Sequence, residues 1–202
     1  MSFFQNTCKP KGLAGNLMVN MMNIGHSSMA EWGMEHIKIQ DTDISLDIGC
    51  GGGANIKKLL KKSPKGKVFG IDYSEVSVRK SKKVNKVAIK SKHCEILQGN
   101  VQELPFTNET FDLVTAFETI YFWADVDQSL RQIYRVLKKG GIFMICNESN
   151  GENNKDKKWT EIIKGMKIYT SEQIKYTLKN AGFTHVEAYK NDKGWLCVVT
   201  QK

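Results

Sequence analysis

A glycine-rich stretch, S-L-D-I-G-C-G-G-G-A-N-I, occupies residues 45–56 and suggests a definite chemistry. Residues 49–54 satisfy the pattern G-x-G-x-x-A, in which a tight turn after a strand holds a nucleotide by backbone N–H groups. Similar turns also recur for steric reasons at strand-to-helix junctions, so the pattern alone identifies no ligand. A second feature is needed, and Asp47, two residues ahead of the first glycine, provides one.

The carboxylate of Asp47 separates two classes of nucleotide ligand. In a dinucleotide site the pyrophosphate lies over the helix N-terminus, where free N–H groups and the helix dipole attract it. A carboxylate beside that position repels a pyrophosphate and attracts an ammonium group. The sequence therefore favours a nucleoside with a cationic amino-acid tail. A nicotinamide-dependent reductase is the alternative, and it is further disfavoured because the expected region has no tyrosine–lysine pair at helical spacing.

A second acid, Asp72, ends the next apolar run in G-I-D-Y-S (residues 70–74). A carboxylate at the end of this strand accepts hydrogen bonds from both hydroxyls of a ribose and disfavours a 2′-phosphate. The alternative role is an N-cap for the helix that begins near Glu75. Because the glycine turn lies about one βα unit upstream, we expect Asp72 to bind ribose.

Short apolar runs alternate with helical patterns along most of the chain. Strands are expected over 44–48, 67–71, 95–98, 111–117 and 141–147, and helices near 54–62, 75–89, 126–138 and 171–181. Such repeated βα units predict an α/β fold with a doubly wound, mostly parallel, seven-stranded sheet. The runs 184–190 and 195–200 are joined by only four residues, which predicts an antiparallel hairpin at the end of the sheet.

Two segments stand outside this alternation. Residues 1–40 are expected to be helical, with an apolar stripe of Leu13, Leu17, Met18, Met21 and Met22 and a second helix over 27–39. Core packing is the first expectation for the stripe. A lid over a ligand is the second, because residues 41–202 form a complete domain without it. The polar stretch 148–158 is expected to be a mobile insertion.

Composition excludes several classes of protein. The chain has 202 residues with 41% hydrophobic and 25% charged residues, and no apolar run is as long as a membrane span. The five cysteines lack metal-ligand spacing, which predicts free thiols in the cytoplasm and no metal site. The net charge is +9, but residues 57–92 hold 13 Lys and Arg against two acids, a surplus of 11 that leaves the rest at −2. We read that surplus as solvated helix faces, which disfavours a nucleic-acid partner.

Five motifs in register resemble the class I S-adenosylmethionine-dependent methyltransferases, in particular the small-molecule group of ubiquinone and menaquinone biosynthesis enzymes. They are L-D-I-G-C-G-G-G (46–53), G-I-D-Y-S (70–74), G-N-V-Q-E-L-P-F (99–106), F-D-L-V-T-A-F-E (111–118) and R-V-L-K-K-G-G (135–141). The resemblance implies a Rossmann-like fold, S-adenosylmethionine as cofactor and a small-molecule methyl acceptor. It also implies a final antiparallel strand.

The resemblance assigns cofactor roles position by position. It implies that the backbone of Gly49, Cys50 and Gly51 passes under the methionine part, with Asp47 oriented to the ammonium group directly or through water. Asp72 would hold the ribose and Tyr73 would pack on the adenine face. The remaining positions are Asn100 and Val101 at the adenine edge and Ala116 and Phe117 near the methionine chain and sulfonium. The family commonly has Asp where Asn100 stands, so somewhat weaker cofactor affinity is expected.

The acceptor side is less defined, because transfer of a methyl group from a sulfonium mainly requires alignment in a dry pocket. A general base is needed only for some acceptors, so no fixed catalytic residue is expected. Candidates are Glu118 and Tyr121 after the fourth strand and His26 from the N-terminal segment. Phe122 and Trp123 are weighed equally as pocket walls or helix anchors. For Lys155, Lys157 and Lys158 a solvated loop is favoured over contacts to an anionic acceptor.

Two alternatives keep the cofactor but change the function: a methyltransferase that acts on RNA or protein, and a non-catalytic adenosyl-binding module. The sequence determines neither the acceptor nor the oligomeric state.

Overall fold

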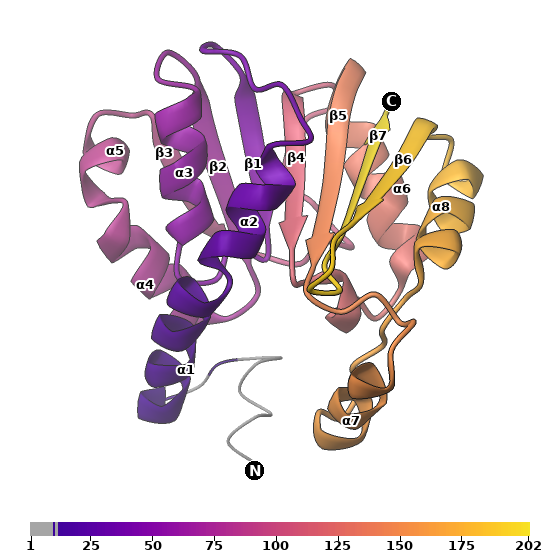
Figure 1. Ribbon diagram of the computed structural model, residues 1–202. Helices are drawn as coiled ribbons and strands as arrows, with labels where there is room; N and C mark the ends of the chain where they lie inside the picture. Colours follow the sequence, from indigo (N-terminus) through magenta and orange to yellow (C-terminus); the bar gives the residue numbers. More distant parts are fainter. Residues whose placement is uncertain (1–9, 11) are drawn as a thin grey trace.

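A seven-stranded sheet forms the centre of the fold, with the strand order β3-β2-β1-β4-β5-β7-β6 (Figure 1). The computed structural model describes residue 10 and residues 12–202. Strands β1 to β5 run parallel, and β7 pairs antiparallel with both β5 and β6. The strands are β1 (Ile44–Ile48), β2 (Lys67–Asp72), β3 (Cys94–Gln98), β4 (Phe111–Phe117), β5 (Leu137–Asn147), β6 (Thr184–Lys190) and β7 (Leu196–Gln201). The predicted doubly wound sheet with a C-terminal hairpin is confirmed.

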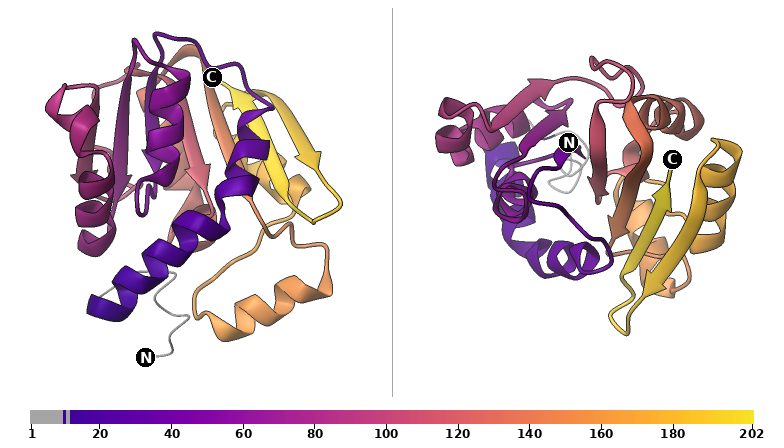
Figure 2. Two further views of the ribbon diagram at one scale, coloured as in Figure 1. Left: turned by 60° about the vertical axis from the view of Figure 1, so that its left-hand side comes forward. Right: turned by 90° about the horizontal axis from the view of Figure 1, so that it is seen from above.

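Helices cover both faces of the sheet, as the two views of Figure 2 show. They are α1 (Gly12–Gly25), α2 (Ser27–Met34), α3 (Ala54–Lys62), α4 (Glu75–Val84), α5 (Lys86–Lys90), α6 (Val126–Val136), α7 (Asn154–Ile162) and α8 (Ser171–Asn180), with a 3-10 turn, η2 (Ile120–Phe122), after β4. One core packs α6 and α8 against one face of the sheet, and a second core packs α2, α3 and α4 against the other.

Apolar residues alternate between these two cores along the central strands. In β5, Phe143 and Ile145 belong to the core under α6 and α8, whereas Met144 and Cys146 belong to the core under α2 and α3. A strand buried on both faces carries such a continuous apolar run, which is why these strands were predictable from the sequence.

The helix predicted near 75–89 is interrupted at Asn85. The Asn85 side chain donates hydrogen bonds to the carbonyls of Gly53, at 3.0 Å, and Ser81, at 3.1 Å. It therefore ties the end of α4 to the start of α3, directly behind the glycine-rich turn. A polar side chain in this position competes with the helix backbone, so the helix restarts as α5.

Two further helix boundaries differ from the prediction. β5 begins at Leu137, so α6 does not continue to residue 138; Leu137 is fully buried and pairs with Phe111. Thr170 caps α8 in a capping box with Gln173, so Ser171 is not the cap. The Thr170 side chain therefore accepts the free N–H at the start of α8, and strand pairing ends α6 before residue 138.

The prediction of a mobile insertion over 148–158 was wrong for its second half, where α7 forms. The Asn153 side chain accepts the N–H of Asp156 at 3.1 Å. The buried Asp156 carboxylate in turn accepts the N–H groups of Asn150, at 3.2 Å, and Gly151, at 2.7 Å. These local bonds close the turn that enters α7, and composition alone does not reveal them.

The N-terminal helices lie beside the carboxyl edge of the parallel strands. Figure 1 shows α1 extending below that edge and α2 rising along the front of the sheet. Met18 and Val19 are buried, whereas Leu17 and Met21 are 54% and 53% exposed. The predicted stripe is therefore split between the inner and outer sides of α1; the side chain of Leu13 lies outside the described residues.

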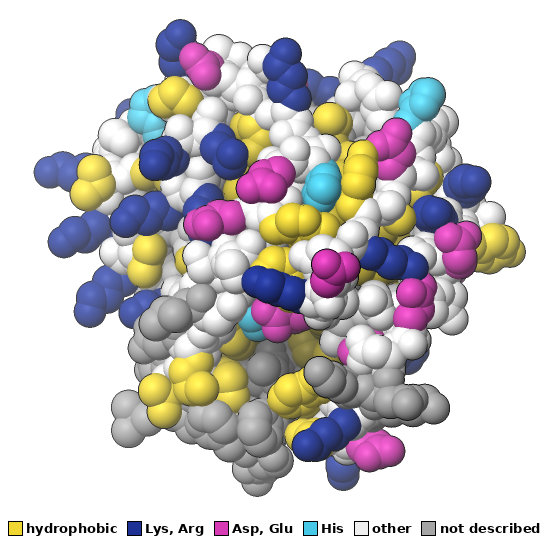
Figure 3. Space-filling model, viewed as in Figure 1, with side chains coloured by type: hydrophobic (Ala, Val, Ile, Leu, Met, Phe, Trp, Pro, Cys, Tyr) yellow, Lys and Arg dark blue, Asp and Glu magenta, His cyan; other side chains and the backbone are white. Residues whose placement is uncertain are grey.

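Basic residues gather on one side of the described surface. Lys and Arg side chains gather over α3, α4 and α5 (Figure 3, left). Among the described residues, none of the helices has the length and apolar character needed to cross a membrane. Cys50, Cys94, Cys146 and Cys197 are free and buried, and Cys8 lies outside the described residues.

A close contact at Gly33 holds α2 against β5. A Cβ atom at this position would lie 2.5 Å from the Cys146 sulfur, nearer than any real contact. We predict that Gly33→Ala lowers the free energy of unfolding by about 1 to 3 kcal/mol, because the core there is already full. Chemical denaturation followed by circular dichroism measures the change.

The control is Gly25→Ala, since a Cβ atom at Gly25 would meet nothing within 4 Å. The double variant Gly33→Ala/Cys146→Ala should lose less stability than the sum of its single variants, because the sulfur that causes the clash is gone. Additive losses would contradict the proposed contact.

Candidate functional site

A cavity opens at the carboxyl edge of the parallel strands, where ligands of doubly wound folds bind. Its walls come from α1, from the turns after β1, β2 and β3, and from the segment after β4. The lining residues are Pro10, Val19, Met22, Asn23, His26, Ile48, Gly49, Cys50, Gly51, Gly52, Ala54, Asn55, Ile71, Asp72, Tyr73, Ser77, Gly99, Asn100, Val101, Gln102, Phe117, Glu118, Thr119, Phe122, Trp123 and Ala124. The N-terminal segment and the sheet thus enclose one space together.

The glycine turn between β1 and α3 forms the floor of this cavity. Gly49 and Gly51 have positive φ angles of 65° and 50°. The N–H groups of Gly49 and Cys50 donate to the carbonyl of Ile71, at 2.8 and 3.1 Å, which fixes the turn against β2. A Cβ atom at Gly49 would lie 2.3 Å from the Thr119 methyl group, so only glycine fits there.

Asp72 lies on the cavity wall and orders the turn above it. One carboxylate oxygen accepts the Gly51 N–H at 2.9 Å, and the other accepts the Ser74 N–H at 2.8 Å. Burial raises the pKa of Asp72, and these two hydrogen bonds act against the rise. The N-cap of α4 is Ser74. The alternative role of Asp72 as that cap was therefore wrong.

Asp47 does not line the cavity, and neither does Ala116. The Asp47 side chain is 1% exposed and turns toward β4, where one oxygen accepts the Thr115 hydroxyl at 2.8 Å; the other has no partner among the described residues. Burial raises its pKa to about 7. Direct contact of this carboxyl with a ligand's ammonium group is not supported by its position, and contact through water stays a prediction.

The predicted adenine-binding residues come together on one side of the cavity. Tyr73 is 39% exposed and Val101 is buried, and both line the cavity with Asn100. The Asn100 side-chain oxygen accepts the Gln102 N–H at 3.1 Å. The N–H of Val101 has no partner in the described part of the chain and is free to bind a ligand.

Glu118 also lines the cavity and follows β4 with a positive φ of 59°. Its Oε1 atom accepts the backbone N–H of Glu148 and the Tyr121 hydroxyl, the latter at 3.2 Å. Burial raises the pKa of Glu118 to about 8, and the Glu148 carboxylate adds to the rise.

Among the aromatic candidates after β4, Phe122 and Trp123 line the cavity, whereas Tyr121 does not. Tyr121 is 1% exposed and does not line the cavity; its hydroxyl accepts the Ser149 N–H at 3.0 Å and lies behind Glu118. Tyr121 is therefore placed to position Glu118 and not to touch a substrate. Phe122 and Trp123 line the cavity instead. One turn of 3-10 helix after β4 decides which ring points inward.

His26, at the junction of α1 and α2, lines the cavity close to Glu118. Its Nε2 atom lies 3.9 Å from Oε2 of Glu148. Burial lowers the pKa of His26, and the Glu148 carboxylate opposes this change. Sequence reasoning missed Glu148, Asn23 and Thr119, although the place of Glu148 directly after β5 was a signal that could have found it.

No Lys or Arg occurs among the described residues that line the cavity, although the chain contains 30 of them. The cavity's acids are Asp72 and Glu118. Lys158, one of the predicted contacts for an anionic acceptor, is exposed on α7, and the side chains of Lys155 and Lys157 lie outside the described residues. The cavity therefore suits cationic or neutral ligands better than phosphates.

The chain is similar to known proteins across this same region. A family model described as "Methyltransferase domain" matches residues 46–145. YrhH of Bacillus subtilis, which is named as a methyltransferase, is 33% identical over 131 residues that make up 65% of this chain and 71% of YrhH. The chain belongs to the S-adenosylmethionine-dependent methyltransferases.

Further relatives support this membership. The demethylmenaquinone methyltransferase of Lactobacillus johnsonii is 30% identical over 138 residues, which cover 67% of this chain and 57% of the Lactobacillus protein. The SAM-dependent methyltransferase structure from Aquifex aeolicus has a TM-score of 0.75 at 20% identity, covering 92% of this chain and 97% of its own. The Haloferax volcanii protein solved in complex with the methyltransferase activator Trm112 has a TM-score of 0.83 at 21% identity, covering 98% and 96%. At these identities the structures show the fold alone.

The buried carboxyl of Asp47 makes the stability of the methyltransferase depend on pH. Its pKa is about 7 in the fold, against 3.8 ordinarily, so the folded state binds more protons between these values and stability falls as pH rises from about 4 to 7. Asp47→Asn keeps an acceptor for Thr115 but has no proton to lose. We predict that its free energy of unfolding, relative to that of the natural protein, increases by about 2 to 3 kcal/mol as the pH rises from 5 to 8.

Urea denaturation of both proteins at several pH values measures this difference. Asp112→Asn is the control, because Asp112 is only half-buried and binds Lys138 at 2.7 Å. A difference between Asp47→Asn and the natural protein that does not change with pH would show that Asp47 is ionised throughout.

Proposed function

We propose that this protein binds S-adenosylmethionine in the cavity and transfers its methyl group to a small-molecule acceptor. The observation that carries the proposal is one cavity that two groups of residues line together. The first group is the glycine turn and Asp72, and the second is Glu118, Phe122 and Trp123, which follow β4. Such a cavity accommodates a nucleoside cofactor beside a second molecule.

The residues present fit this cofactor better than a dinucleotide. The unpartnered N–H of Val101 and the half-exposed ring of Tyr73 suit an adenine, and the Asp72 oxygens can accept further hydrogen bonds from a ribose. Because Lys and Arg are absent from the described lining, a pyrophosphate would meet no cation there, whereas an ammonium and a sulfonium would meet acids.

S-adenosylmethionine, when bound, supplies an electrophilic methyl group, and the protein's contribution is to align the acceptor and exclude water. Val19, Met22 and Asn23 of α1 lie over the glycine turn, and a Cβ atom at Gly52 would meet the Asn23 side chain at 2.3 Å. We therefore propose that the segment 1–40 acts as a lid as well as a packing element.

Several observations favour a small acceptor over RNA. The Lys and Arg side chains of α3, α4 and α5 do not line the cavity, and the described lining offers no cation to a phosphate. Relatives named demethylmenaquinone methyltransferase and cycloartenol-C-24-methyltransferase point in the same direction. Phe122 and Trp123 give the acceptor end an apolar wall suited to an organic molecule.

The first test is the affinity for S-adenosylmethionine. We predict that the natural protein binds it in isothermal titration calorimetry and that Asp72→Ala binds at least about tenfold more weakly, because charge-assisted hydrogen bonds to the ribose are lost. Thermal unfolding of the variant should remain cooperative. Glu95→Gln is the matched control, since Glu95 is exposed on β3 and pairs with Lys67, at 3.0 Å.

Unchanged affinity in Asp72→Ala would remove the ribose assignment. Stabilisation by NADH without stabilisation by S-adenosylmethionine would overturn the proposed function as a whole. Transfer of a labelled methyl group to a compound in a metabolite extract then distinguishes an enzyme from a non-catalytic adenosyl-binding module.

A second prediction concerns the adenine edge. Asn100→Asp should bind S-adenosylmethionine at least as tightly as the natural protein, because a carboxylate accepts hydrogen bonds from the adenine amine more strongly than an amide does. The Asp side chain also keeps the oxygen that accepts the Gln102 N–H. A large loss of affinity in the same calorimetric measurement would show that Asn100 does not face the adenine.

A further inference from the structure

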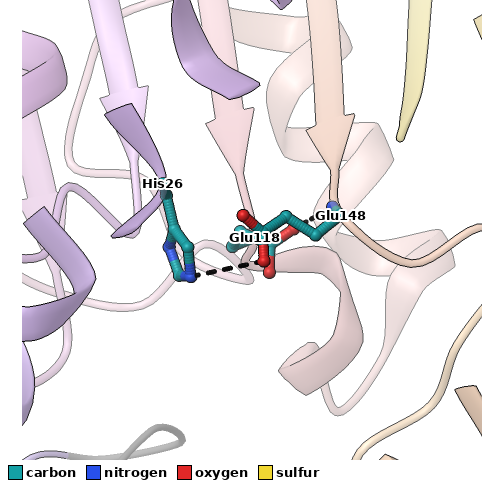
Figure 4. A group of neighbouring side chains, drawn as sticks. All are labelled: His26, Glu118 and Glu148. Atoms are coloured by element: carbon teal, nitrogen blue, oxygen red, sulfur yellow. Dashed lines mark hydrogen bonds and ion pairs between the residues drawn. The ribbon is translucent and has the colours of Figure 1, made fainter. Parts of the chain in front are cut away.

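We infer that His26, Glu118 and Glu148 form a binding site for a divalent first-row transition metal ion, such as Mn²⁺ or Zn²⁺, at the acceptor end of the cavity. One ligand atom from each residue lies within 4.8 Å of the other two. Figure 4 shows the three side chains converging from three separate parts of the fold.

The distances agree with a site that closes slightly around an ion. With donor–metal bonds of about 2.1 Å, neighbouring donor atoms lie about 3 to 4 Å apart. The distance from His26 Nε2 to Glu148 Oε2 is 3.9 Å, which is too long for a hydrogen bond and suitable for two ligands of one ion. The largest separation, 4.8 Å, requires a movement of about 1 Å.

Glu118 is held in a position that leaves one oxygen for a ligand. Its Oε1 atom accepts hydrogen bonds from the Glu148 N–H and the Tyr121 hydroxyl. Its Oε2 atom has no hydrogen-bond partner among the described residues, and the carboxylate lies next to His26 and Glu148 (Figure 4). Such outer hydrogen bonds orient metal-ligating carboxylates in known sites.

Charge gives an independent reason for a cation. Glu118 and Glu148 lie close together, and the described cavity lining contains no Lys or Arg that would compensate them. The 3.9 Å contact with His26 is the one ion pair found for Glu148 in the described structure. A divalent cation between the two carboxyl groups would compensate the charge of both in their ionised form.

The donor set selects the class of metal. One imidazole nitrogen and two carboxylate oxygens suit Mn²⁺, Fe²⁺ or Zn²⁺, whereas Mg²⁺ and Ca²⁺ prefer oxygen ligands alone. Three protein ligands leave coordination positions open toward the cavity, as in catalytic metal sites. An ion here could bind an oxygen atom of the methyl acceptor; this role rests on the proposed function, but binding of the ion does not.

Two of the three ligands lie outside the residues that the family model matches. The matched domain spans residues 46–145, whereas His26 precedes it and Glu148 follows it. The site is therefore assembled from the matched domain, through Glu118, and from segments on either side of it. The proposal revises the expectation of no metal site.

Titration of the chelator-treated full-length protein with Mn²⁺, followed by electron paramagnetic resonance of the free ion, tests the proposal. We expect one equivalent to bind, and Glu148→Gln to weaken binding at least about tenfold. His26→Gln should have a similar effect. The matched controls are Glu95→Gln and His185→Gln, which change exposed residues of β3 and β6 and should bind Mn²⁺ as the natural protein does.

Glu148→Gln is the most informative variant, because the Glu148 backbone N–H that holds Glu118 is retained. Its affinity for S-adenosylmethionine should be unchanged, which separates loss of an ion ligand from collapse of the cavity. Absence of Mn²⁺ binding at millimolar concentration, or binding that survives both Glu148→Gln and His26→Gln, would overturn the metal site. Neither result affects the proposed function, which is tested separately by binding of S-adenosylmethionine and by transfer of its methyl group.

Discussion

The candidate site depends on close packing around the glycine turn between β1 and α3. Side chains at Gly49, Gly52 and Gly53 would collide with Thr119, Asn23 and Ser81, respectively. Each collision involves a different part of the fold: the segment after β4, the N-terminal helix and α4. Because the turn carries no side chains there, these three parts approach one another and enclose a single cavity.

Electrostatics give the cavity a character opposite to that of the whole protein. The chain has a net charge of +9, yet its described cavity lining contains acids and no Lys or Arg. Ten of the 30 Lys and Arg residues lie on α3, α4 and α5, and such side chains gather on this side of the surface (Figure 3). A low-dielectric cavity with uncompensated carboxyl groups favours cationic ligands, and both a sulfonium cofactor and a divalent ion meet that condition.

Segments on either side of the matched methyltransferase domain lie near the cavity, and the one that precedes it, α1 with His26, helps to line it. α1 and His26 come before residues 46–145, and Glu148 and the turn into α7 come after them. The matched domain holds the groups proposed to bind the cofactor, whereas the segments outside it contribute His26 and Glu148 to the proposed metal site. Members of one family can therefore bind the same cofactor and differ in acceptor.

The sequence by itself determined the sheet, its hairpin and most of the cofactor end, because buried parallel strands and glycine turns leave local patterns. Only the tertiary structure decided where three side chains point: Asp47 turns away from the cavity toward Thr115, Tyr121 lies behind Glu118, and Phe122 lines the wall. The grouping of His26, Glu118 and Glu148 was equally hidden. Local spacing fixes the period of a helix or strand, but contacts between residues 30 or more positions apart depend on how the elements pack.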